Sequence, residues 1–254
     1  MRAYLAQTRA ELAMSLRQGE QVLVSLGIPL LILVFFSLVE VLPQFPDVRV
    51  TPLDTPLPAP LKAVDSIAPS VLALAIMSTA MVSLGIGTGF ERYYQVLKRL
   101  GATPLGRTRL VAAKISMVLV LELIQLAVLV PTALVLGWQP GGRVWQVVPA
   151  YVLGTAAFAG LGLLMAGTLK GTVNLAASNA LYLVLLLGGG IMVPLEKLPE
   201  PLRGAGRLLP SGALSEVMHY SLTPNVVFPK AAWLVLAGWA VALPLAAARF
   251  FRWE

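Results

Sequence analysis

The chain has 254 residues, of which 57% are hydrophobic and only 12% are charged. Because a soluble domain is about a quarter charged, this composition excludes a single soluble domain and predicts an all-α polytopic membrane protein. The chain has no cysteine, which excludes disulfides and thiolate chemistry. Lys and Arg in cytoplasmic loops explain the formal net charge of +7 better than nucleic acid binding does.

Residues 2–19 are predicted to form an amphipathic helix that lies at the membrane interface. Three leucines recur along one stripe of this helix, and arginines flank the stripe where their stems can reach the headgroups. The stripe consists of Leu5, Leu12 and Leu16. A solvated helix without membrane contact is the alternative interpretation. The segment lacks an early apolar core and a small-residue cleavage site, so we do not interpret it as a signal peptide.

Six apolar segments follow, each near the ~20 residues that a helix needs to cross a bilayer. They cover residues 22–42, 67–90, 110–136, 147–169, 173–193 and 231–248, and together they predict one transmembrane domain over residues 1–254. The proline-rich stretch 43–65 predicts an extended outer loop between the first two segments. Within the second segment, Gly85 and Gly89 form a small-xxx-small pair that permits close helix approach.

The distribution of positive charge predicts the orientation of these segments. Twelve of the nineteen Lys and Arg residues fall in the N-terminal segment, the 91–114 region, the turn at residue 170 and the C-terminus. The other seven are spread over the alternate loops, where acidic residues partly offset them. Since cytoplasmic loops carry the excess of Lys and Arg, both termini and the 91–109 stretch are expected in the cytoplasm.

The stretch ERYYQVLKRLGATPLGRTR, residues 91–109, carries the densest positive charge of the chain. A helix over Glu91–Leu100 would have two distinct faces, and Gly101 followed by Pro104 would end it. One face holds Tyr93, Val96, Leu97 and Leu100, and the other holds Arg92, Gln95, Lys98 and Arg99. Two interpretations are open: a solvated loop that only sets topology, or a docking element for a cytoplasmic partner.

The segment between the fifth and sixth spans, residues 194–229, contains two short amphipathic pieces that prolines separate. One piece is centred on Leu202 and Leu208, and the other is centred on Leu214 and Met218. Neither piece is long enough to span a bilayer. Both could re-enter the outer leaflet under cover of protein, or both could lie flat on the surface.

Four polar residues inside the predicted spans are candidates for a translocation path: Glu122, Gln125, Asn174 and Asn179. An ionisable group at mid-span normally faces the bundle interior or a wet cavity, so Glu122 either lines a path or is a buried acid held by polar neighbours. Interhelical hydrogen bonding is the default interpretation of the two asparagines. His219, the one histidine, has no nearby ligand set and is interpreted as a surface residue.

The usual catalytic and nucleotide-binding motifs are missing from the sequence. There is no HExxH, no G-x-S-x-G, no closely spaced pair of Asp residues and no G-x-x-x-x-G-K-[ST] loop. We therefore expect no catalytic, metal or cofactor site on this chain. The energy for transport must come from an ion gradient or from a partner protein.

Two stretches resemble the membrane-spanning permease subunit of type-2 ABC transporters, in the branch of bacterial drug exporters of the daunorubicin-resistance kind. LKRLGATPLGRTRL, residues 97–110, is similar to the segment between the second and third spans of that family. GGGIMVPLEKLPEPLRGAGRLLPSGALSEV, residues 188–217, is similar to its outer segment before the last span. The six-span layout and the N-terminal surface helix also fit, so the resemblance covers nearly the whole chain.

The resemblance implies a coupling mechanism. Two permeases, here a homodimer, would form the pathway, and two separate cytoplasmic ATPase subunits would bind ATP and Mg²⁺ beneath them. The 91–100 helix would be the coupling element that rests in a groove of the ATPase. Glu91, Arg92, Lys98 and Arg99 would then contact the ATPase, while Tyr93, Leu97 and Leu100 would anchor the helix.

The resemblance also implies export of a lipophilic, drug-like or lipid-linked substrate across a bacterial cytoplasmic membrane. Two alternatives come from other functional classes. A gradient-driven transporter would usually show internal repeats or broken helices with ion ligands, and a lipid-modifying membrane enzyme would need clustered acids or histidines. Neither pattern is found in the sequence. Within the leading class, a haem or polysaccharide exporter is not separated from a drug exporter.

Overall fold

The computed structural model describes residues 2–17, 23–39, 62–101, 107–193, 195–224 and 227–252. Within these ranges all regular structure is helical, which confirms the predicted all-α class. Five of the described helices are long and apolar enough to cross a membrane: Ala63–Tyr93, Arg109–Val135, Val144–Thr168, Gly171–Gly188 and Lys230–Phe250. The segment predicted as the first span, 22–42, contains the shorter apolar helix Ser25–Leu38, and its flanks 18–22 and 40–61 lie outside the described residues.

The described residues form the following elements in chain order. They are α1 (Arg2–Arg17), η1 (Leu23–Gly27), α3 (Ile28–Leu38), α4 (Ala63–Ile76), η2 (Met77–Ser83), α5 (Leu84–Tyr93), α6 (Val96–Gly101), α7 (Arg107–Val135), η3 (Val144–Gln146), α8 (Val147–Thr168), α9 (Gly171–Gly188), η4 (Leu195–Lys197), α10 (Glu200–Leu208), α11 (Pro210–Leu222) and α12 (Lys230–Phe250). Two of them, η1 and η2, are π-helical. The segments α4, η2 and α5 form one continuous rod.

Among the boundaries that differ from the pattern-based expectation, two have a clear local cause. The outer loop was predicted to extend to Asp65, but α4 begins at Ala63 because the Asp65 carboxylate accepts hydrogen bonds from the backbone N–H groups of Lys62 and Gln139, each at 3.0 Å. At the other boundary, α9 ends at Gly188 although the apolar run continues to Val193. The turn there is built on Gly190, whose φ of +73° is disfavoured for other residues.

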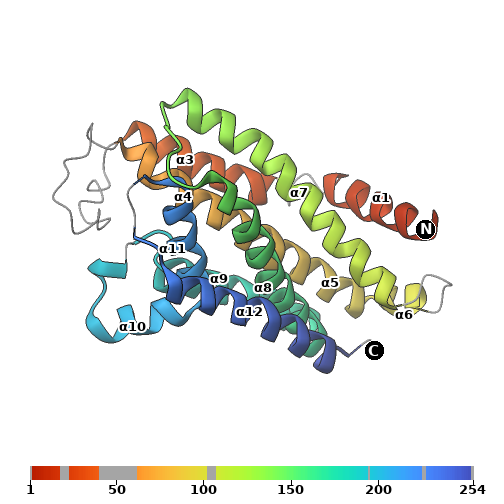
Figure 1. Ribbon diagram of the computed structural model, residues 1–254. Helices are drawn as coiled ribbons and strands as arrows, with labels where there is room; N and C mark the ends of the chain where they lie inside the picture. The colour runs from red at the N-terminus through yellow and green to blue at the C-terminus, as the bar shows by residue number, and fades with distance from the viewer. Residues whose placement is uncertain are drawn as a thin grey trace.

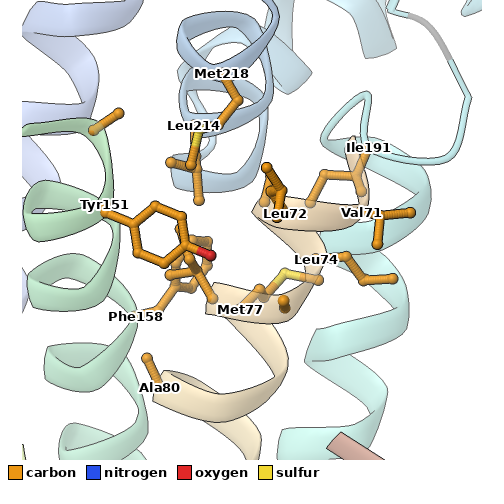
Figure 2. Packing of buried hydrophobic residues seen from close by; sticks show 14 of the residues in the cluster. Val71, Leu72, Leu74, Met77, Ala80, Tyr151, Phe158, Ile191, Leu214 and Met218 are labelled. Carbon is orange, nitrogen blue, oxygen red and sulfur yellow. The ribbon is translucent and has the colours of Figure 1, made fainter. Parts of the chain in front are cut away.

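The centre of the bundle is the contact between the α4–η2–α5 rod and α8. Figure 2 shows Tyr151 and Phe158 of α8 pointing towards the rod, which carries Met77 at this level, with Leu214 of α11 above them. The backbones touch at a glycine pair, since a Cβ on Gly85 would lie 2.9 Å from the Gly162 Cα. The predicted close approach at Gly85 therefore occurs, and its partner is α8.

The two short outer helices differ in their environment. Helix α11 is buried along most of its length and packs against α4, α8 and α12, so it inserts into the bundle. Its neighbour α10 is mostly exposed, with one charged side carrying Glu200, Arg203 and Arg207. Of the two amphipathic pieces, the one that forms α11 is therefore buried within the bundle, and the one that forms α10 lies on its surface.

The ends of the bundle are distinct in Figure 1. The start of α1, the short helix α6 and the end of α12 lie at one end, and α10 lies at the opposite end. The basic segments that sequence analysis groups together are therefore also grouped in space. We refer to the end that holds α1 and α6 as the basic end.

Candidate functional site

The stretch that was expected to form one helix over Glu91–Leu100 forms two. Helix α5 ends at Tyr93 and α6 begins at Val96, with a break at Tyr94 and Gln95. Gln95 has a φ of +62°, a left-handed conformation that a continuous helix does not allow. The expectation of a continuous helix is wrong because apolar periodicity persists across the break and gives no signal of it.

Helix α6 packs onto the basic end through two leucines, of which Leu97 is the more deeply buried. Leu97 is only 1% exposed and lies against Leu110 of α7, with Leu100 and Phe251 beside it. Lys98 and Arg99 are exposed on the outer side of α6, and Val96 is 37% exposed. Helix α6 therefore exposes Lys98 and Arg99 on its outer side, while Leu97 on its inner side holds it against the bundle.

Two exposed tyrosines stand at the corner between α5 and α6. Tyr93 and Tyr94 are 58% and 64% exposed, and their rings meet edge to face with centroids 5.2 Å apart. The Tyr94 ring also stacks on Phe90, which holds it at the corner. Amphipathic aromatic rings of this kind suit a surface where protein or headgroups are contacted.

Glu91 points into the protein and belongs to a buried ionic cluster with Glu11 and Lys114. The Lys114 ammonium, 3% exposed, lies 3.0 Å from Glu11 Oε2 and 2.6 Å from Glu91 Oε2. Gln7 of α1 donates a hydrogen bond of 2.8 Å to the other oxygen of Glu11. The ionic cluster thus joins α1, the end of α5 and α7 at the basic end.

Arg92 fastens the same corner to a fourth helix. Its guanidinium donates hydrogen bonds of 2.9 and 3.1 Å to the backbone carbonyl oxygens of Ala166 and Leu169. These carbonyls belong to the C-terminal turn of α8, where the helix dipole favours a positive charge. The two neighbours Glu91 and Arg92 therefore connect the α5–α6 corner to different helices. Glu91 contacts Lys114 of α7, which also binds Glu11 of α1, and Arg92 binds the end of α8.

A second polar cluster lies in the middle of α7. Thr155 of α8 donates a hydrogen bond of 2.7 Å to Glu122 Oε2, and Gln125 Nε2 donates to Thr79 Oγ1 at 2.7 Å. Gln125 Nε2 also donates to the backbone oxygen of Ser25 at 2.9 Å. Because Ser25 and Thr79 lie in the π-helical segments η1 and η2, this cluster connects four spans where two helices depart from regular geometry.

Several atoms of this mid-span cluster have no hydrogen-bond partner in the structure. Glu122 Oε1, Gln125 Oε1 and the hydroxyl of nearby Tyr151 are all buried and unpaired. Glu122 and Gln125 are 2% and 3% exposed. Such atoms are costly in an apolar interior and are most often explained by water or by a role in a functional state.

Thr155→Val is expected to destabilise the fold by about 1–3 kcal/mol, because it removes the hydroxyl that donates to the buried Glu122 carboxyl. The measurement is a denaturant titration of the purified chain in detergent. Thr168→Val is the matched control, since the Thr168 hydroxyl is exposed and bonds only within its own helix. Equal effects of the two substitutions would show that the Thr155–Glu122 bond contributes nothing to stability.

The two asparagines expected to share a path lie in different places. Asn174 is fully buried and donates a hydrogen bond of 2.9 Å to the backbone oxygen of Gly85. It occupies the space above Gly89, where a Cβ would lie 2.3 Å from its side-chain nitrogen. Asn179 is exposed and bonds Leu175 of its own helix. Of the four candidates, the structure brings only Glu122 and Gln125 into one cluster.

His219 is half-buried between α11 and α4 rather than on the surface. One ring nitrogen lies 2.8 Å from the Ser215 carbonyl oxygen, and the other lies 3.1 Å from the Ser66 carbonyl oxygen. The expectation of a surface histidine is therefore wrong. The described residues contain no group of three or more metal-ligating side chains, either here or elsewhere.

Sequence analysis missed Glu11 and Lys114 as partners of Glu91. Lys114 was counted with the topology-setting charges because it lies close to the basic loop, but it is buried within α7. The position of Lys114 inside an apolar run could have predicted its burial, since a charged residue at such a position needs a partner. Glu11, the one acidic residue of the leucine-rich helix 2–17, could have been predicted as its partner.

The comparison with known families decides the class of this protein. The model of the ABC-2 family transporter protein matches residues 38–248 of the chain. The chain belongs to the ABC-2 transporter family. The family consists of membrane components of ABC transporters, and its permeases generally work with a separate ATPase subunit. A comparison with curated proteins gave no match.

Proposed function

We propose that this ABC-2 permease exports a lipophilic, drug-like or lipid-linked substrate, and that a separate ATPase docks on α6 at the basic end. The family match over residues 38–248 carries the proposal. The exposed Lys98 and Arg99 support it, because Leu97 anchors the helix beneath them and keeps them presented outward. A groove of the ATPase with acidic rims would complement this surface.

In this proposal the permease is a homodimer in a bacterial cytoplasmic membrane, of the drug-exporter branch, with both termini cytoplasmic. Two ATPase subunits bind ATP and Mg²⁺ and push α6 when they close. The grouping of α1, α6 and the end of α12 at one end of the bundle supports this orientation. Glu91 and Arg92 have a supporting role, since their side chains hold the corner from within.

Arg99→Glu is expected to weaken binding of the ATPase at least about tenfold, because it reverses a charge on the docking surface. The measurement is co-purification of the tagged permease with its ATPase, followed by titration of the purified partners. Arg249→Glu is the matched control, since Arg249 is equally charged and exposed at the end of α12. Unchanged binding in Arg99→Glu, or equal loss in both variants, would contradict docking on α6.

Leu97→Asp is a poor substitute for this test, because Leu97 is buried. An aspartate there would place an unpaired charge against Leu110 and displace α6 itself. A loss of coupling in that variant would report the packing of α6 and not its surface. A substitution at the exposed Arg99 changes the charge of the docking surface without changing the packing of α6.

A further inference from the structure

The ionic cluster of Glu11, Lys114 and Glu91 brings together residues that are far apart in the sequence. Lys114 and Glu11 are separated by 103 positions, yet their side chains meet at 3.0 Å. Both are nearly inaccessible to solvent, with exposures of 3% and 4%. The contact is therefore a feature of the folded interior, and water cannot replace either partner without moving a helix.

Burial makes this cluster a joint that resists separation. An ammonium group removed from water is stable only while carboxylates hold it, and charge-assisted hydrogen bonds are the strongest that side chains make. If α1 or the end of α5 moved away from α7, one of the two carboxylates would lose its contact with the buried Lys114 ammonium. Both segments are thus held to one point of α7.

The sequence neighbour of Glu91 extends this connection to the central helix of the bundle. Arg92 binds the carbonyl oxygens of Ala166 and Leu169 at the end of α8. The α5–α6 corner therefore cannot shift without pulling on α7 and α1 through Glu91 and on α8 through Arg92. Helix α1 has further side-chain contacts with α7, since the hydroxyl groups of Tyr4 and Ser116 share a hydrogen bond and Ser15 donates to the Met117 sulfur at 3.5 Å. These contacts reach α7 alone, whereas the ionic cluster joins α1 to the end of α5 as well.

We propose that the ionic cluster is the joint through which a displacement of α6 reaches α1, with Lys114 as the positioning residue. This inference rests on the docking role proposed for α6. Helix α1 then moves together with the α5–α6 corner, and both segments displace α7 through Lys114. Without the cluster, α6 still moves with the ATPase, but α1 stays behind.

Spin labels test this directly, because the chain has no cysteine and single cysteines can be introduced on a clean background. Exposed positions Val96 on α6, Ala10 on α1 and Arg249 on α12 accept labels without disturbing the core. The two distances to measure by pulsed EPR are 96–249 and 10–249, in the permease–ATPase complex with and without ATP. We expect both distances to change with ATP in the complex that carries no other substitution.

Glu11→Leu is expected to abolish the ATP-dependent change of the 10–249 distance and to preserve the change of the 96–249 distance. Lys114 keeps Glu91 as its partner in this variant, so the fold and the ATPase docking surface remain. The same 10–249 distance without ATP verifies that α1 stays docked. Thr8→Val is the matched control on the same helix, since the Thr8 hydroxyl donates to the Tyr4 carbonyl oxygen within α1 and the substitution leaves the contacts of Glu11 in place.

Three outcomes would overturn the proposal in distinguishable ways. If α1 moves with ATP in Glu11→Leu as it does without the substitution, the cluster is not the joint. If Thr8→Val stops the movement equally, general packing of α1 is responsible and the ion pair is not. If the 96–249 distance never changes with ATP, the docking role of α6 fails, and the joint fails with it.

Discussion

Lys114→Met is expected to destabilise the permease by about 3–5 kcal/mol, the largest effect that we predict for a single substitution. The substitution leaves the buried carboxylate of Glu11 and the partly buried carboxylate of Glu91 beside each other without the cation that now holds them at 3.0 and 2.6 Å. The measurement is an unfolding titration of the detergent-solubilised permease.

The control for this substitution is Lys230→Met, which makes the same chemical change at an exposed position at the start of α12. Its effect should lie within about 0.5 kcal/mol, as for most surface substitutions. The triple variant Lys114→Met, Glu11→Gln and Glu91→Gln should recover much of the lost stability, since a neutral cluster contains no unpaired charge. If the triple variant were as unstable as Lys114→Met alone, electrostatics would not be the cause.

Gly162→Ala is expected to cost about 3 kcal/mol, although alanine is normally the better helix former. A Cβ at this position would lie 2.6 Å from the carbonyl oxygen of Met81 and 3.1 Å from that of Ala80. Both obstacles are backbone atoms, so no side-chain rotation can relieve the overlap. The rod and α8 would have to separate along the contact that organises the whole core.

Matched glycine substitutions make this prediction specific. Gly87 in α5 and Gly238 in α12 have no atom within 4 Å of an added Cβ. Gly87→Ala and Gly238→Ala should therefore stabilise their helices by up to about 1 kcal/mol, the intrinsic difference between the two residues. Unfolding titrations of the three variants give the comparison. A neutral Gly162→Ala would show that α8 and the rod are not in backbone contact.

The helical content and its membrane character could be predicted because they depend on local sequence. Long apolar runs without charges favour helices in a bilayer, since each backbone hydrogen bond is satisfied within the segment. The close approach at Gly85 was likewise visible, because small residues four apart allow backbones to meet. The partner of Gly85, which is Gly162 of α8, could not be predicted, since many other glycines of the chain would allow the same close approach.

The details of the candidate site depended on contacts between distant segments. The break at Gln95 places a non-glycine residue at a positive φ, which costs roughly 1–2 kcal/mol locally. The packing of Leu97 on Leu110 accompanies this conformation, and periodicity within the segment does not register such a contact. The pairing of Lys114 with Glu11, 103 residues away, is hidden from local patterns for the same reason.

The sequence by itself determined that this is a helical membrane protein with a basic segment between two spans, because composition and spacing control burial in lipid and orientation across it. Only the tertiary structure decided which charges face inward. Glu91 and Arg92 belong to the basic stretch by sequence, yet their side chains hold the corner to α7 and α8. A buried charge is stable only beside its partner, and helix packing alone sets which residues become partners.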